Sequence, residues 1–539
     1  MRLSHLMKKA NRPTRGLILA LASLSMPAVA RPQEPPPADA LQRFEERLKA
    51  LEDENRALRE QVRELAESKA VALDASGGTT SAGAASATTP NPNPSTAGDS
   101  AAAGASGAPT ARVGPTAAAF NARGARKRIP LNAWLGQGFE LASEDDEYQL
   151  QFHNETQVDY RLFDHTGQGT VHNGFFIPRQ IWTFNGRFTR NVEYLASFQR
   201  GLGAFELRDA LVNFKVLEKD RLMIKVGRYR VPYTYEFYAV ANMDLISPER
   251  SVFALNFSNL REIGAMAWGL LADDRIDYAA GIFNGVRNGF EDFNDEPSFV
   301  GFFNARPFRH SERFPFLNYL NVGASTDVGN QGNNTQAPLA LRTSVNASLA
   351  SGASTASPAF LSFNNGVREN GMRAMGSVHA AWFYKRLSLL AEWDRGVVNY
   401  VATPNAQPFA RVDVPVDAYY VQAGFFLTGE NVTRRGPFDV KRPFNLKRGE
   451  DFGLGAVELA ARYATLRVGD EVFTAGLADR NLWSNDAQVT DIGFNWYLNQ
   501  YLKVYLDWQH TEFGRPVTFG PGRFYVNSDL YWARLQLLF

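Results

Sequence analysis

The last nine residues of the chain alternate between apolar and polar side chains in a way that few folds can use. Every second residue from 531 to 539 is apolar: Tyr531, Ala533, Leu535, Leu537 and Phe539. The opposite face carries the polar residues Arg534 and Gln536. A strand with lipid on one side and an aqueous lumen on the other needs this pattern. We therefore expect a barrel-closing strand in which Tyr531, Leu535, Leu537 and Phe539 act as a C-terminal assembly signal.

The same period-two alternation continues through most of residues 130–539. One segment, for example, reads Leu-Lys-Val-Tyr-Leu-Asp over residues 502–507. The pattern predicts sixteen antiparallel strands that start near residues 147, 174, 191, 204, 221, 261, 275, 297, 316, 372, 387, 414, 452, 488, 501 and 527. Tight turns such as 190–191 and 385–386 alternate with long connections, as periplasmic turns and outer loops do in transmembrane barrels. A soluble all-β fold would also alternate. The loop rhythm and the export signal described next favour an all-β transmembrane β-barrel of about sixteen strands.

The N-terminal residues have the composition of an export signal. Residues 1–30 contain a basic stretch, then an apolar run from 16 to 26, then Pro-Ala-Val-Ala. This order predicts a secretory signal peptide that is cleaved after Ala30. The apolar run is shorter than the ~20 residues that a spanning helix needs, and no later segment supplies such a run. Export to the outer membrane, with outer-membrane lipid as a partner, is the expectation.

Charge and cysteine content exclude several classes of protein. Lys and Arg number 57 and Asp and Glu number 56, so no basic excess points to nucleic acid, and we expect no nucleic-acid partner. The chain has 0 cysteines, which removes disulfides and thiolate metal sites. Histidines are scattered singly, and we therefore expect no metal and no cofactor.

The segment at residues 38–67 has the spacing of a coiled coil. Its a and d positions are Leu41, Phe44, Leu48, Leu51, Asn55, Leu58, Val62 and Leu65. Across a parallel interface the flanking charges, Arg47 with Glu52 and Glu54 with Arg59, are opposite in sign. The pattern predicts parallel self-association into a homo-oligomer, in which Asn55 favours two strands although a three-chain assembly tolerates it. A single amphipathic helix that packs on its own barrel is the alternative.

Residues 68–129 form a different kind of segment. Most of it is Ala, Gly, Ser, Thr, Pro and Asn, and its composition cannot bury enough apolar surface to fold. We therefore expect a flexible linker between the coiled coil and the barrel at residues 130–539. Such a tether could bring the N-terminal segment into contact with cell-wall material.

Several motifs of the barrel region occur in the same order as in one known family. They are Phe-Asn-Gly at 184–186, Leu-Arg-Asp-Ala at 207–210, Val-Gly-Arg-Tyr-Arg-Val-Pro at 226–232, Glu236, Pro-Glu-Arg-Ser at 248–251, Gly264, Gly-Ile-Phe-Asn-Gly at 281–285, and residues 419–430, 458–463 and 493–499. Through them, residues 145–539 resemble the phosphate-selective porin O and P family. The resemblance implies a trimeric channel of sixteen strands that passes small anions, with loops folded inward to narrow the pore.

The resemblance also implies which side chains would guide anions. Arg179 and Arg250 occupy positions that match basic residues of the family's pore, where guanidinium groups suit phosphate oxygens. By strand parity Arg187 and Lys225 also face the lumen, and Arg342 lies in the long connection at 327–370. That connection is otherwise rich in Gly, Asn, Ala and Ser, so an arginine-rich loop of the family is largely missing. The predicted lumen also carries carboxylates, and the alternative is that these basic groups are ordinary cross-paired wall residues.

The expected function follows from the barrel. We expect a passive, water-filled outer-membrane channel for small hydrophilic solutes, with anions such as phosphate as the expected cargo. The chain has no Gly-x-Ser-x-Gly, His-Glu-x-x-His or P-loop motif, and we expect no enzyme. The alternative is a structural barrel that tethers the envelope through its coiled coil and conducts little or nothing.

Overall fold

The computed structural model describes Lys49 and residues 129–539, apart from residues 137, 170, 202–204, 293, 335, 346–355, 403–410 and 448–450. The chain divides into two units, Met1–Ala118 and Ala119–Phe539, and all described strands belong to the second. The expected signal peptide, the eight seam positions of the coiled coil and nearly all of the linker lie outside the described residues.

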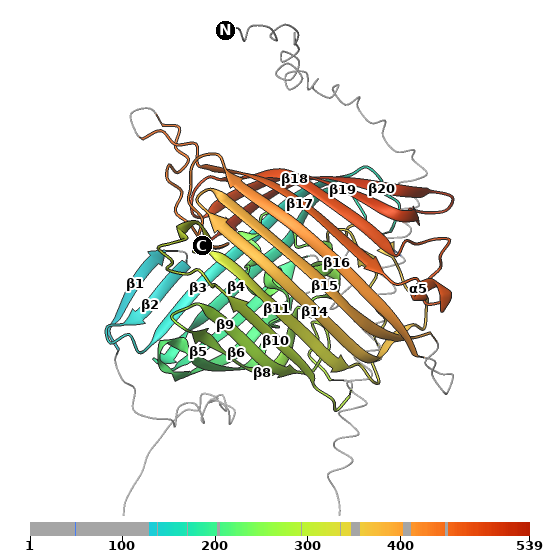
Figure 1. The fold of residues 1–539 in the computed structure, drawn as a ribbon. Coiled ribbons are helices and arrows are strands. Elements are labelled where there is room, and N and C mark those ends of the chain that lie inside the picture. Colours follow the sequence, from blue (N-terminus) through green and yellow to red (C-terminus); the bar gives the residue numbers. More distant parts are fainter. Residues whose placement is uncertain are drawn as a thin grey trace, which may run out of the picture. The chain divides into compact units, whose positions relative to one another are not determined.

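Sixteen antiparallel strands close into one barrel, which confirms the predicted fold class (Figure 1). They are β3 (Gln149–Phe163), β4 (Gly174–Thr189), β5 (Val192–Gly201), β6 (Glu206–Leu217), β7 (Leu222–Arg230), β8 (Arg261–Leu271), β9 (Ile276–Phe283), β10 (Ser298–Ala305), β11 (Leu320–Asn330), β14 (Arg368–Tyr384), β15 (Leu387–Val401), β16 (Arg411–Phe426), β17 (Ala456–Val468), β18 (Asp486–Tyr497), β19 (Leu502–Thr518) and β20 (Phe524–Leu538). Each pairs with its neighbour in sequence, and β20 pairs with β3 to complete the ring. A strand that crosses lipid needs such closure, because an open edge would leave backbone groups without partners.

The strand starts agree closely with the alternation pattern. The largest differences are at Leu320, Arg368 and Ala456, where the sequence predicted starts near 316, 372 and 452. The structure also contains a two-residue strand β12 (Leu341–Arg342) and a short strand β13 (Ala359–Leu361), which pair with each other outside the barrel sheet. Among the residues that the structure describes, no helix combines the length and the apolarity that a membrane crossing requires.

A hairpin before the barrel was not predicted. β1 (Leu131–Gly136) pairs with β2 (Gly138–Ser143), and β2 pairs with the first residues of β3, from Phe139↔Phe152 to Ala142↔Gln149. β20 pairs with the rest of β3, so β2 occupies the part of the β3 edge that β20 leaves open. Every residue of β1 is exposed, which explains why its sequence shows no one-sided pattern.

The alternation separates an outer from an inner face. In β20, Tyr531 and Leu535 are 55% and 46% exposed, whereas Arg534 between them is 1% exposed. Phe539 lies at the seam: its backbone N–H donates to Asn154 O at 3.1 Å, and the Asn154 N–H donates to Phe539 O at 2.6 Å. The Phe539 ring also makes an edge contact with Phe152, at a centroid distance of 6.3 Å. The residues of the expected assembly signal thus lie where the two ends of the sheet meet.

The two ends of the barrel differ in their connections. Short turns such as 190–191 and 385–386 lie at the end where the chain finishes, which is the periplasmic end in barrels of this kind. The connection at 427–455 is at this end but is long. Its Phe438 ring packs against Phe426 and Tyr497, at centroid distances of 4.9 and 4.8 Å. This apolar packing holds the part around Phe438 at that end of the lumen, where residues 433–437 line a cavity together with the 231–260 connection. The sequence rule had led us to expect only short turns there.

Candidate functional site

The connection between β7 and β8, residues 231–260, folds into the lumen and is called loop 3 below. It contains the short helices α3 (Tyr235–Tyr238), η2 (Asn242–Asp244) and α4 (Val252–Phe257). Apolar side chains cause the inward fold: Val231, Tyr233, Leu245, Ile246, Val252 and Phe253 are buried against inward-facing residues of β14 to β18. One side of the lumen is therefore packed, and solvent-accessible space is restricted to the rest.

The tip of loop 3 is fixed to the barrel wall by buried charges. Glu249 accepts two hydrogen bonds from Arg179 of β4, at 2.5 and 2.6 Å, and one from Arg534 of β20, at 2.9 Å. Arg462 of β17 donates to Glu249 O at 2.7 Å. Burial alone would raise the pKa of Glu249, but Arg179 and Arg534 outweigh it and lower the pKa to about 2. Glu249 therefore stays ionised. It links loop 3 to β4 and to β20, which lie on opposite sides of the β20–β3 seam.

Arg250, the other residue expected on the anion pathway, holds loop 3 together. Its guanidinium donates to the Glu236 carbonyl, to Val240 O at 2.9 Å and to Asn242 Oδ1 at 2.8 Å. It also lies over the Phe237 ring, 4.9 Å from the centroid. Burial is the main cause that lowers the pKa of Arg250, to about 10. Arg250 therefore stabilises the fold of loop 3, because its guanidinium donates to oxygen atoms of the same loop.

The remaining expected residues are spread along the barrel. Arg187 pairs with Asp146 beside the periplasmic turns, and Arg342 donates to Ser357 O at 2.7 Å in the connection between β11 and β14. Lys225 of β7 lies over the Trp268 ring at 4.5 Å, and within the described residues no carboxylate forms an ion pair with it. Only Arg179 and Arg250 are brought together, because Arg179 of β4 bonds Glu249, the residue before Arg250 in loop 3. Lys225 faces a separate cavity.

That cavity has more basic than acidic side chains in its lining. It has a volume of about 330 Å³ and lies between the wall strands β3 to β8 and the Tyr238–Met243 part of loop 3. Its charged lining residues are Arg208, Lys225, Arg230, Arg261, Glu155 and Asp209. Arg261 pairs with Asp209 at 2.8 Å, which leaves an excess of positive charge. We call this hollow the basic cavity.

Three basic residues of this cavity were missed in the sequence: Arg208, Arg230 and Arg261. Arg230 has the parity of the exposed residues Ile224 and Val226, so the sequence predicts a position past the lipid band or at a bulge that leads into loop 3. In the structure its guanidinium donates to Phe237 O and Val240 O, both at 3.1 Å. Loop 3, folded against the end of β7, supplies these partners, and no pattern within β7 could reveal them.

A larger cavity of about 770 Å³ opens beside the periplasmic turns and shares Tyr238 and Ala241 with the basic cavity. Its charges are mostly paired across the wall. Arg306 pairs with Asp277, and Arg309 lies 3.5 Å from Asp274. Asp244 of loop 3 is also part of this lining. We call this hollow the periplasmic vestibule, because it leads from the turns to the basic cavity.

The charge of Asp244 should make the vestibule sensitive to pH. Burial raises the pKa of Asp244 to about 6, against the opposing effects of Arg435 and Lys503. The carboxyl is therefore neutral below about pH 6 and negative above it, and its charged form destabilises the fold as pH rises past the unfolded pKa near 4. We expect the preference for anions to rise about twofold when the pH falls from 7 to 5.

Reversal potentials at each pH would measure this change. Asp244→Asn should abolish it, whereas Asp292→Asn, in an exposed outer loop, should leave it intact. An unchanged pH response in Asp244→Asn would contradict the assignment.

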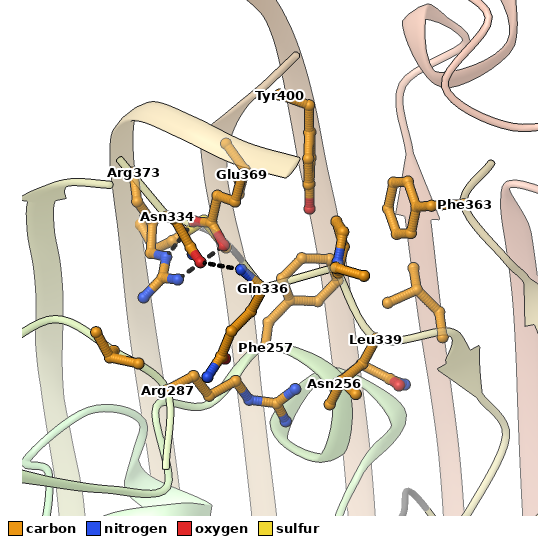
Figure 2. Close-up of a pocket in the computed structure, with 16 residues that line it drawn as sticks. Asn256, Phe257, Arg287, Asn334, Gln336, Leu339, Phe363, Glu369, Arg373 and Tyr400 are labelled. Carbon is orange, nitrogen blue, oxygen red and sulfur yellow. Dashed lines mark hydrogen bonds and ion pairs between the residues drawn. The ribbon is translucent and has the colours of Figure 1, made fainter. Parts of the chain in front are cut away.

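A third hollow lies on the other side of loop 3, among Phe257 at the end of α4, Arg287 and the first residues of β14 (Figure 2). Loop 3 thus stands between an outer pocket and two inner cavities. Across the described residues, no group of three or more His, Asp or Glu side chains is arranged to hold a metal ion. The arrangement can bind and pass hydrated ions at a few weak cationic positions.

A known protein family matches most of the barrel. The model of the family described as phosphate-selective porin O and P matches residues 150–512. Among curated proteins, Porin O of Pseudomonas aeruginosa is 30% identical over 95 residues, which is 17% of this chain. The matched stretch spans 20% of the length of that protein.

The chain is also similar to two solved structures of outer membrane proteins. The trimer form of OmpT, an outer membrane protein of Vibrio cholerae, has a TM-score of 0.43 and 9% identity over 73% of this chain and 100% of its own. An anion-selective porin from Comamonas acidovorans has a TM-score of 0.42 and 10% identity, again over 73% of this chain and 100% of its own.

Proposed function

Because this chain belongs to the phosphate-selective porin O and P family, we propose that it is a passive, water-filled channel of the outer membrane for small hydrophilic solutes. The closed sixteen-strand barrel, narrowed by an inward loop 3 beside the basic cavity, is the observation that carries the proposal. Family and fold favour a channel over an enzyme. Association into a trimer is part of the proposal, supported by the heptad seam and by the family resemblance.

Small anions such as phosphate are the solutes that the basic cavity favours. Its lining has four cationic side chains and two carboxylates. Ions pass a pore when binding is favourable enough for entry and weak enough for release. Arg179 and Arg250 are engaged in structural contacts, so the proposal assigns anion contact to Lys225, with Arg208 and Arg230 adding positive potential. Arg187 and Arg342 then contribute to the wall and to the outer connection rather than to a continuous path.

Conductance of the full protein in a planar bilayer tests the channel directly. We expect stable, ohmic steps, and a salt gradient should give a reversal potential that indicates anion preference. A barrel that only tethers the envelope would give no steps, and cation preference would refute the assigned solute class.

Lys225→Gln should lower the anion-to-cation permeability ratio by about threefold, because it removes one charge at close range in a partly desolvated cavity. Lys385→Gln is the matched control, since Lys385 lies in a tight turn, 5.1 Å over the Tyr384 ring, and outside the cavity. If the two substitutions change the permeability ratio equally, Lys225 does not contact the permeating anions.

A further inference from the structure

The outer pocket lies above loop 3 and has walls from five separate segments, one of which is β14 with Glu369, Arg373 and Met375. Asn256 and Phe257 come from loop 3, Arg287 from the connection after β9, and Tyr400 from β15. Residues 336–341 and Phe363, from the connection between β11 and β14, cover the remaining side. The pocket has a volume of about 80 Å³ and is open to solvent at its mouth, so a single-ring molecule would lie partly inside it and partly at the mouth.

Much of this lining is apolar and aromatic. Phe363 packs on Tyr400 with ring centroids 5.0 Å apart, and the two rings stand on one side of the pocket. Figure 2 shows Phe257 near the centre of the pocket, facing these two rings. Met375 and Val398, both buried, form part of the wall. A hydrated inorganic ion gains nothing from such walls, whereas a flat apolar group buries its surface against them.

The charges of the pocket leave one cation without a counter-ion. Arg373 neutralises Glu369 through two bonds, from Nε to Oε1 at 2.7 Å and from Nη2 to Oε2 at 2.9 Å (Figure 2). Arg287 donates from Nε to Ser258 O at 2.7 Å and from Nη2 to Leu255 O at 2.6 Å. Within the described part of the chain, Arg287 forms no ion pair and its Nη1 makes no hydrogen bond.

A second donor accompanies this guanidinium. The Tyr400 hydroxyl has no hydrogen-bond partner among the described residues, and Figure 2 shows it directed into the pocket. Two carbonyl bonds hold the Arg287 guanidinium at the end of α4, so its position is set before any ligand arrives. A fixed guanidinium is a strong partner for a carboxylate, because the bonds are charge-assisted and little side-chain entropy is lost.

We propose that the outer pocket binds small monocarboxylates whose apolar body is a single ring, with the carboxylate on Arg287 and Tyr400 and the ring between Phe257 and Phe363. This site deepens the proposed function, on which it rests, because it names an organic anion that the channel would capture from the outside. Inorganic phosphate lacks the apolar body, and acetate lacks the ring.

Calorimetric titration of the full protein in detergent with sodium benzoate tests binding without relying on conduction. We expect benzoate to bind about tenfold more tightly than acetate or inorganic phosphate, since burial of one ring face amounts to roughly 1.4 kcal/mol. Arg287→Gln and Phe257→Ala should each weaken benzoate binding about tenfold. Tyr400→Phe, which removes only the hydroxyl, should weaken it about threefold.

Arg523→Gln, at an exposed arginine of another outer loop, is the matched control and should leave benzoate affinity unchanged. Equal affinity for the three anions, or equal loss in the control, would overturn the proposal. Chloride conductance of the same preparation is measured in parallel. Conduction without benzoate selectivity would refute the outer pocket alone, whereas an absence of conduction would refute the channel.

Discussion

Arg534→Ala is expected to lower the free energy of unfolding by about 3–5 kcal/mol, the usual cost of removing one partner from a buried ionic network. Arg534 is 1% exposed and donates to both carboxylate oxygens of Asp159, at 2.6 and 2.9 Å. It also donates to Glu249 of loop 3 at 2.9 Å. Without the arginine, two buried carboxylates would lose a counter-ion at the seam. Urea unfolding in detergent, followed by tryptophan fluorescence, measures the change.

The chain offers a matched control for this substitution. Arg395 lies on the outer face with its side chain 72% exposed, and its nearest carboxylate, Asp417, is 4.0 Å away. Arg395→Ala should change the free energy of unfolding by less than about 1 kcal/mol, because exposed pairs contribute little. If both variants unfold at the same urea concentration, burial of the Arg534 network does not stabilise the barrel.

Removal of the inward part of loop 3 is expected to raise single-channel conductance by about threefold or more, since the bore of a sixteen-strand barrel without an inward loop is an open aqueous channel. The variant replaces residues 242–257 by a short Gly-Ser link. The deleted part contains the tip that Arg179, Arg462 and Arg534 hold to the wall. Conductance steps in symmetrical salt measure the effect.

A second variant tests the constriction without deleting any segment of the chain. Tyr238 lines both the basic cavity and the periplasmic vestibule, so Tyr238→Ala should raise conductance by a smaller factor while the barrel stays intact. Leu506→Ala, at an outward-facing residue, should leave conductance unchanged. Equal conductance in the deletion and in the original protein would show that loop 3 is not the constriction.

The barrel could be predicted because its chemistry repeats. Each strand places apolar groups toward lipid at every second residue, so the inward parity of Arg534 and Lys503 could be predicted from their neighbours alone. The β1–β2 hairpin could not be predicted in this way, because every residue of β1 is exposed and neither face carries a pattern. Alternation of apolar and polar residues indicates only which environment each face of a sheet contacts.

The constriction could be predicted only in part. The motif at 248–251 indicated Arg250. The role of the adjacent residue Glu249, however, depends on ion pairs with residues that are distant in sequence. Glu249 meets Arg179 across 70 positions and Arg534 across 285. Such partners depend on how the barrel closes and on where loop 3 docks, which are tertiary facts. For the same reason Arg250 was expected on the ion path, while the structure places its donors on the carbonyls of its own loop.

The attachment of loop 3 has a consequence for biogenesis. Its anchors belong to β4 near the beginning of the ring and to β17 and β20 near its end, so no half-built sheet can offer all of them at once. An assembling chain can therefore complete these anchors only when its first and last strands join. Closure of the β-barrel and fixation of loop 3 in the channel then occur together, late in assembly. The permeability barrier of the membrane depends on that last stage.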